Sequence, residues 1–144
     1  MSELEKIMEK YIHQVKYYET DKMGITHHSN YIRWMEEARI DYLEQIGWGY
    51  DKLEKMGIIS PVLSVDCNYK QSTTFPDEVE IGVKVKEFNG VRFVLEYEMK
   101  KLPEQAVVCM ATSEHAFLDR EFKPFRLKKE YPDFYEAMKA AVEK

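Results

Sequence analysis

The sequence lacks the features that would place a protein in a membrane or hold it together by disulfides. No apolar run approaches the ~20 residues that a membrane-spanning helix needs. The first residues, MSELEKIMEKY, lack the apolar segment and cleavage site of a signal peptide. Only two cysteines occur, and both Cys67 and Cys109 lie in strand-like runs, where a reduced thiol packs as a small apolar group. We therefore expect a cytoplasmic protein without a membrane span.

Positive charge is also scarce. The chain has 21 Lys and Arg against 26 Asp and Glu, and this net charge of −5 argues against nucleic-acid binding, because phosphate recognition needs clustered cations. With 44% hydrophobic residues the composition is that of a globular protein, and 144 residues are enough for one buried core. No repeat or low-complexity linker divides the chain, so a single domain over residues 1–144 is expected.

Several common catalytic motifs are missing. The absence of GxSxG, P-loop and GxGxxG patterns removes the usual serine-hydrolase, nucleotide and dinucleotide functions. The adjacent pair His27 and His28 is a poor metal site, because neighbouring side chains seldom converge on one ion and no HExxH or Cys/His spacing accompanies them. The sequence therefore predicts neither a metal nor a cofactor.

Regular periodicities predict an α+β domain. Alternating apolar residues predict five strands, over residues 11–19, 62–70, 79–88, 91–101 and 106–119. Helical spacing predicts a long helix from Tyr31 to Gly47, capped by Ser29 or Asn30, a short helix over 50–56 and a C-terminal helix over 130–144.

The order of these segments favours one antiparallel sheet packed on the long helix. Asn89-Gly90 predicts a tight hairpin, and the four later strands are expected to follow one another as a meander. We expect the strand over 62–70 to be half-buried and the run over 106–119, apolar on both faces, to be central or at an interface. The C-terminal helix should bury Phe134, Met138 and Val142.

Residues 17–31, YYETDKMGITHHSNY, place a polar segment between a strand-like and a helix-like run. With its ETDxMG pattern followed by HxNY, this segment resembles the acyl-CoA thioesterases of the 4-hydroxybenzoyl-CoA thioesterase-like branch of the hot-dog fold, which includes the Tol-Pal-associated thioesterases. The similarity extends to the element order of nearly the whole chain. It implies a hot-dog fold, in which about five antiparallel strands wrap around one long helix. It also implies hydrolysis of acyl-CoA to the free acid and CoA by a homodimer or homotetramer.

The resemblance also implies the catalytic residues. Asp21 takes the position of the catalytic carboxylate, either as general base or as nucleophile, and the backbone N–H of His28 that of an oxyanion donor. The side chains of His28 and Tyr17 match catalytic-site residues of some members. The placement is physically reasonable, because the first N–H groups of a helix lack internal acceptors and carry partial positive charge.

Three further residues of the segment are expected to contact substrate. Gly24 would permit a positive φ or a close approach of the substrate. His27 stands where several relatives have tyrosine, so the resemblance does not imply an acyl preference, and Asn30 belongs to the HxNY pattern.

Structural alternatives accompany these assignments. Asp21 could simply close an Asx turn, and Glu19, expected on the same face of an extended backbone, is the rival catalytic carboxylate. His13 and His115 lie in strands, where a structural histidine is the default expectation. The aromatic residues Tyr31, Trp34, Tyr42 and Trp48 are expected mainly in the core.

Two other functions remain open at this stage. An acyl-carrier-protein thioesterase would need a basic docking patch for its acidic partner. Six residues could supply that patch: Lys100, Lys101, Lys123, Arg126, Lys128 and Lys129. A non-catalytic acyl-CoA-binding or sensor protein of the same fold is the second alternative.

Overall fold

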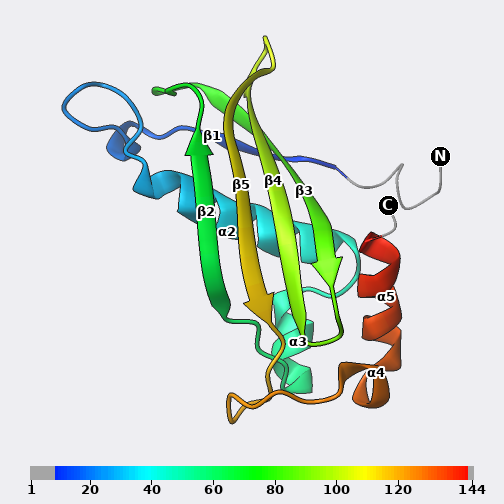
Figure 1. Cartoon of the computed structure of the whole chain (residues 1–144). Coiled ribbons are helices and arrows are strands. Elements are labelled where there is room, and N and C mark those ends of the chain that lie inside the picture. The colour runs from blue at the N-terminus through cyan, green and yellow to red at the C-terminus, as the bar shows by residue number, and fades with distance from the viewer. Residues whose placement is uncertain (1–8, 143–144) are drawn as a thin grey trace.

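Five antiparallel strands form one sheet that lies across a long helix (Figure 1). The computed structural model describes residues 9–142. The strands are β1 (Tyr11–Gln14), β2 (Val62–Tyr69), β3 (Glu78–Phe88), β4 (Arg92–Leu102) and β5 (Ala106–Ala116). Their order in the sheet is β1-β3-β4-β5-β2. This arrangement confirms the predicted α+β hot-dog fold.

The long helix, α2 (Ser29–Gln45), packs on the inner face of the sheet (Figure 1). A 3-10 turn, η1 (Tyr17–Glu19), precedes it and the short helix α3 (Tyr50–Met56) follows. The C-terminal segment forms α4 (Leu127–Glu130) and α5 (Pro132–Val142). None of the helices within residues 9–142 is long and apolar enough to cross a membrane.

The first strand is much shorter than predicted. β1 ends at Gln14, and residues 17–19 turn into η1 because the Glu19 carboxylate accepts the backbone N–H of Lys16 at 2.7 Å and draws the chain back on itself. The predicted caps of α2 are also wrong, since His28 is the N-cap residue and makes no side-chain capping bond. The hairpin at Asn89-Gly90 is confirmed, with Gly90 at φ +95°.

The predicted meander holds for β3, β4 and β5 but fails for β2. β2 pairs with β5 at the far edge of the sheet instead of preceding β3 as its neighbour. It is exposed along most of its length, with Leu63 at 46% and Tyr69 at 46%, so the expected half-burial is wrong within this single chain. β5, in contrast, lies between β4 and β2, as its two apolar faces predicted.

The core lies between α2 and the sheet and is closed at one end by α5. Trp34, Met35, Ala38 and Leu43 of α2 are buried. α5 buries Phe134, Met138 and Ala141, whereas Val142 is exposed, because Ala141 lies seven residues, or two helical turns, beyond Phe134. The prediction for Val142 is therefore wrong, and residues 143–144 of the predicted helix lie outside the described residues.

Candidate active site

The loop between η1 and α2 is closed on itself by its own backbone. A bridge joins Thr20 and Thr26, and the Asp21 N–H donates to the Ile25 carbonyl at 2.8 Å. Gly24 donates its N–H to the Asp21 carbonyl at 2.9 Å and adopts φ +81°. The positive φ expected for Gly24 is thus confirmed, and it explains why glycine suits this position.

The Asp21 carboxylate is half-buried and held in one orientation. Its Oδ1 atom accepts the Met23 N–H at 2.8 Å, so the Asx turn that we considered as an alternative is present. The other oxygen, Oδ2, has no hydrogen-bond partner among residues 9–142. The turn and a chemical role are therefore compatible, because one oxygen orients the group and the other stays available.

A pocket of about 350 Å³ lies beside Asp21. Three segments line it, namely the loop, the start of α2 and the end of β2 with the residues that follow. The lining residues are Asp21, Met23, Ile25, Thr26, His28, Tyr31, Tyr69, Lys70, Gln71 and Ser72. We did not predict the wall formed by residues 69–72, although the polar run after the second predicted strand marked a loop there.

The start of α2 leaves one backbone amide free. The N–H groups of Ser29, Asn30 and Tyr31 all find acceptors on His27 or His28, at 3.0 to 3.2 Å. No acceptor within residues 9–142 faces the His28 N–H. Because the helix N-terminus carries partial positive charge, this amide is suited to an oxygen that develops negative charge.

The structure brings Asp21 and His28 to the pocket and leaves the other predicted contacts outside it. Tyr17 is 77% exposed, with its ring edge-on to Phe75 at 5.9 Å. His27 is exposed, stacks on His28 at 4.3 Å and contacts the Ser29 hydroxyl at 2.9 Å.

Asn30, also predicted to contact substrate, is buried and joins the two ends of the loop. Its Nδ2 donates to the carbonyls of Glu19, at 3.0 Å, and His27, at 3.1 Å.

A hydroxyl cluster fixes the loop to the chain segment after β2. Thr26 contributes both its N–H, at 2.8 Å from the Thr73 carbonyl, and its hydroxyl, at 2.6 Å from Thr73 Oγ1. The Tyr31 hydroxyl lies 3.0 Å from the same Thr73 oxygen. Tyr31 is thus a core residue, as expected, and also part of the pocket wall. Nothing in the local sequence pattern pointed to Thr73.

Glu19 does not share the pocket with Asp21. The expectation that both carboxylates leave the same face is wrong, because η1 is not extended and turns Glu19 inward. Its side chain is 6% exposed and bonds to His13 Nε2 at 2.9 Å and Trp34 Nε1 at 2.9 Å. His13 is thus buried outside the pocket, with its Nε2 contact satisfied within the fold.

A second buried polar cluster lies further along α2. Arg39, 2% exposed, contacts His115 Nδ1 at 2.9 Å and donates to the Ser60 carbonyl at 3.2 Å. His115 Nε2 lies 2.7 Å from the Ser113 hydroxyl. Burial, followed by the nearby Arg39 charge, lowers the pKa of His115 to about 3. The structural role expected for His115 is thus observed.

Five of the six basic residues considered for a docking patch lie in two separate groups. Lys100 and Lys101 stand in β4 opposite the first residues of β3, at the end of the sheet nearer the pocket. The hairpin at residues 89–90, at the other end of β3, borders a separate pocket with Arg126, Lys128 and Lys129. About 30 Å of strand separates the two groups. Among residues 9–142, no His, Cys, Asp or Glu cluster is arranged to hold a metal ion.

Known proteins of one family resemble this chain in sequence and fold. A family model described as "Thioesterase-like superfamily" matches residues 15–142. The chain is 34% identical to the Bacillus subtilis protein named "Putative acyl-CoA thioesterase YneP", over 89% of this chain and 93% of that one. A crystal structure of a DHNA-CoA thioesterase from Staphylococcus aureus superposes with a TM-score of 0.86 and 35% identity, covering 92% of this chain and 89% of that one.

Proposed function

The chain belongs to the thioesterase-like superfamily, and from that premise we propose that it hydrolyses an acyl-CoA thioester to the free carboxylic acid and CoA. One observation carries the proposal. The Asp21 carboxylate and the start of α2, whose His28 N–H has no acceptor within residues 9–142, border the same pocket. Two relatives named as thioesterases, each at least 34% identical over most of the chain, support it.

The proposed reaction needs an attacking oxygen and a place for negative charge. Asp21, with Oδ2 available, takes the proton from a water whose oxygen bonds to the thioester carbon, or attacks that carbon itself. The carbonyl oxygen becomes an oxyanion, which the His28 N–H stabilises. A donor of this kind is worth about 2.7–4 kcal/mol. When the carbon–sulfur bond breaks, the CoA sulfur leaves with the electron pair. In the water route it takes up the proton that Asp21 removed from the water. In the direct route a water then cleaves the anhydride between Asp21 and the acyl group, which releases the free acid and the proton that the sulfur takes up.

The His28 side chain would act beside the thioester. Its ring is edge-on to Tyr69 at 6.2 Å, and both residues line the pocket. Either ring nitrogen could hold the water or protonate the leaving sulfur. We assign the direct role in substrate binding to the pocket residues, and to Asn30 a role in shaping the loop.

Coenzyme A is favoured over acyl-carrier protein as the thiol carrier. An acidic protein partner would need one continuous basic surface near the pocket, and five of the six cations are divided between two ends of the sheet. Lys100 and Lys101, at the nearer end, would be enough for the phosphates of CoA. Hydrolysis of the same acyl group on the two carriers tests this choice.

A turnover screen tests the function itself. Hexanoyl-, lauroyl-, palmitoyl-, benzoyl- and 1,4-dihydroxy-2-naphthoyl-CoA would be offered to the wild type and to Asp21→Asn, with thiol release as the readout. The dihydroxynaphthoyl substrate is included because the Staphylococcus aureus relative is named for it. We expect release by the wild type and little by the variant. Tight binding of these compounds without hydrolysis would instead support a sensor.

We also infer that the protein works as a homodimer joined through β2. β2 is an edge strand, and exposed apolar side chains follow it and the neighbouring face of α2. These residues are Ile32, Ile40, Val62, Leu63, Val65 and Tyr69. An open edge of this kind would otherwise invite aggregation. Sedimentation should give a dimer for the wild type and a monomer for Leu63→Lys, and a monomeric wild type would refute the inference.

A further inference from the structure

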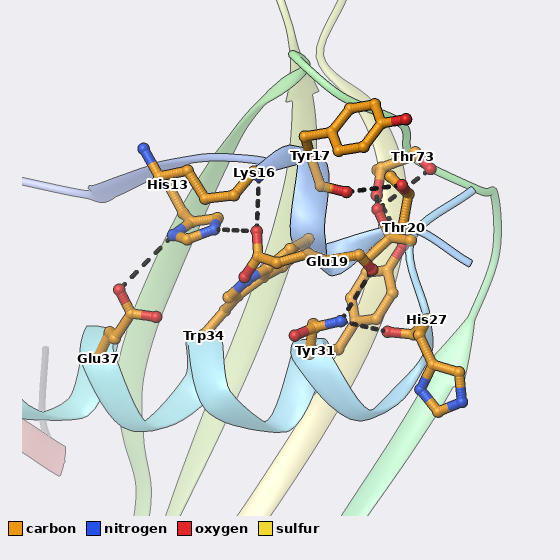
Figure 2. A network of polar contacts seen from close by, with 12 residues as sticks. His13, Lys16, Tyr17, Glu19, Thr20, His27, Tyr31, Trp34, Glu37 and Thr73 are labelled. Atoms are coloured by element: carbon orange, nitrogen blue, oxygen red, sulfur yellow. Dashed lines mark hydrogen bonds and ion pairs between the residues drawn. The ribbon is translucent and has the colours of Figure 1, made fainter. Parts of the chain in front are cut away.

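The Glu19 carboxylate is a buried anion with donors from three segments. His13 Nε2 of β1 lies 2.9 Å from it, the Lys16 N–H donates at 2.7 Å, and Trp34 Nε1 of α2 donates at 2.9 Å (Figure 2). Burial opposes ionisation of Glu19, but these bonds outweigh it and lower its pKa. The carboxylate is therefore charged at neutral pH and held between β1 and α2.

The backbone of Glu19 connects this anion to the pocket. Its carbonyl accepts the His27 N–H at 2.9 Å and the Asn30 Nδ2 at 3.0 Å. Glu19 thus binds the chain where the loop departs and where it returns. Asp21 follows Glu19 by two residues, and the His28 N–H follows His27 by one, so the separation of carboxylate and amide depends on how firmly Glu19 is held.

His13 joins Glu19 to a second carboxylate. Its Nδ1 lies 3.5 Å from Glu37 Oε1, which also accepts the Tyr11 hydroxyl at 2.7 Å. The ring packs on Trp34, with centroids 4.7 Å apart, and is 8% exposed. Because each ring nitrogen faces a carboxylate oxygen, the imidazole bridges two anions when both nitrogens carry a proton. Its Nε2 contact is the one that reaches the catalytic loop.

We propose that His13 and Glu19 are positioning residues that set the distance between the Asp21 carboxylate and the His28 N–H without touching substrate. This inference rests on the proposed thioester hydrolysis. Neither side chain lines the pocket, and both are nine-tenths buried, so their effect must pass through the loop ends that Glu19 binds. A merely structural role would change the unfolding free energy and leave the turnover of folded protein intact.

Two substitutions of His13 separate the positioning role from simple stability. In His13→Gln, the new side-chain amide can place its nitrogen near the site of Nε2. This variant keeps the donor to Glu19 and loses the donor to Glu37. The amide of His13→Asn reaches only the site of Nδ1, which keeps the donor to Glu37 and loses that to Glu19. Each variant retains one donor and one carboxylate contact, so the pair is matched in chemistry.

The expected result is a difference in kcat between the two. Hydrolysis would be measured with whichever of the five screened acyl-CoA substrates the wild type turns over fastest, at a temperature well below every melting point. We expect His13→Gln to stay near the wild-type kcat and His13→Asn to lose about tenfold to a hundredfold, the cost typical of a slightly misplaced reacting group. KM should change little in either, since the pocket lining is intact.

A stability control and a second variant complete the test. Ser113→Ala deletes a buried hydroxyl in the Arg39 cluster, whose contacts are with Tyr97 and His115 and not with the loop, and should lower the melting point without lowering kcat. If His13→Asn does not fold, Trp34→Phe replaces it, because this change removes the indole donor to Glu19 and keeps an aromatic ring. Its kcat should also fall.

The outcomes distinguish this inference from the proposed function. If His13→Gln and His13→Asn have equal kcat values, the positioning role alone is overturned. If His13→Asn does not fold and the Trp34→Phe variant that replaces it has the wild-type kcat, the positioning role alone is likewise overturned. A wild type that hydrolyses none of the five acyl-CoA substrates of the turnover screen overturns both proposals. A kcat loss in Ser113→Ala as large as in His13→Asn would show that stability, not position, controls turnover.

Discussion

The cluster around Glu19 and the cluster around Arg39 both connect α2 to the sheet, and they stand about 7.5 Å apart along the helix axis, from Trp34 to Arg39. In the first, a buried anion receives three donors. In the second, a buried cation faces a histidine whose depressed pKa keeps it neutral. Arg39 Nε has no hydrogen-bond partner among residues 9–142, so this second cluster is the less completely satisfied of the two.

The clusters differ most in what their backbone connects. Glu19 binds both ends of the loop that carries Asp21. Arg39 binds Ser60, in the segment before β2, and His115 at the end of β5. The comparison teaches that burial and hydrogen bonding alone do not assign a role. We expect perturbation of the first cluster to appear in turnover and perturbation of the second in stability.

The largest effect is expected from Asp21→Asn, at the loop that the first cluster positions. Loss of a general base or nucleophile should lower kcat about 100- to 10,000-fold, equivalent to about 3–5 kcal/mol of transition-state stabilisation. The melting point should change little, because the amide oxygen can still accept the Met23 N–H. Steady-state kinetics and calorimetry on the same preparation check this, with the exposed Asp51→Asn as control. A near-normal kcat would remove Asp21 from the mechanism.

Arg39→Leu should show the opposite behaviour in the second cluster. Removing the cation leaves His115 Nδ1 and the Ser60 carbonyl without their donor, and should cost about 3 kcal/mol of unfolding free energy. The low end of the usual range applies because Glu36, the ion-pair partner at 2.6 Å, is 45% exposed and can be hydrated. Urea unfolding gives the measurement. A large kcat loss in protein that is still folded would break the distinction between the clusters.

A smaller effect should appear in the pH dependence of stability. His115 titrates near 6.5 when unfolded and near 3 when folded, so below 6.5 the unfolded chain takes up a proton that the folded chain excludes. Stability is complete above that value and falls as the pH drops, by about 1.4 kcal/mol from about pH 7.5 to 5.5. His115→Gln should lack this loss.

Glu19 should respond in a different pH window. Its pKa is lowered from 4.5, so its contribution is present above that value and is lost only in more acidic solution. The unfolding free energy of Glu19→Gln, measured in urea at each pH, should therefore vary with pH as in the wild type above pH 4.5. The two pH dependences should differ only below pH 4.5. If His115→Gln and Glu19→Gln changed the pH dependence of stability over the same pH range, the assignment of separate clusters would be contradicted.

The smallest effect is expected from Tyr97→Phe. The Tyr97 hydroxyl lies 2.7 Å from the Ser113 hydroxyl at the far end of the second cluster. When the Tyr97 hydroxyl is removed, the Ser113 oxygen keeps its contact with His115. The loss should be about 1 kcal/mol of unfolding free energy, with kcat unchanged. Chemical denaturation and initial-rate kinetics together measure it, and a kcat below half the wild-type value would be unexpected.

Local patterns were enough to predict most elements and the centre of the site. Asn89-Gly90 specified its hairpin because Gly90 tolerates positive φ and the Asn89 side chain accepts the N–H groups of Val91 and Arg92. The apolar spacing from Tyr31 onward specified α2 because one face had to be buried. Asp21 and Gly24 could be predicted together, since the Asx turn and the positive φ both depend on residues within one short turn of the chain.

The strand order, the burial of Glu19 and the wall formed by residues 69–72 could not be predicted in this way. β2 lies beside β5, more than 35 residues later in the chain, and nothing in its alternation distinguishes that neighbour from β3. Glu19 is polar and stands two residues from Asp21, yet donors from β1 and α2 bury it. The amino-acid sequence by itself determined which segments are helix or strand and which carboxylate bears the family motif, because those properties depend on residues close together in the chain. Only the tertiary structure decided which groups meet, because long-range packing and hydrogen bonding select among partners that local periodicity leaves equivalent.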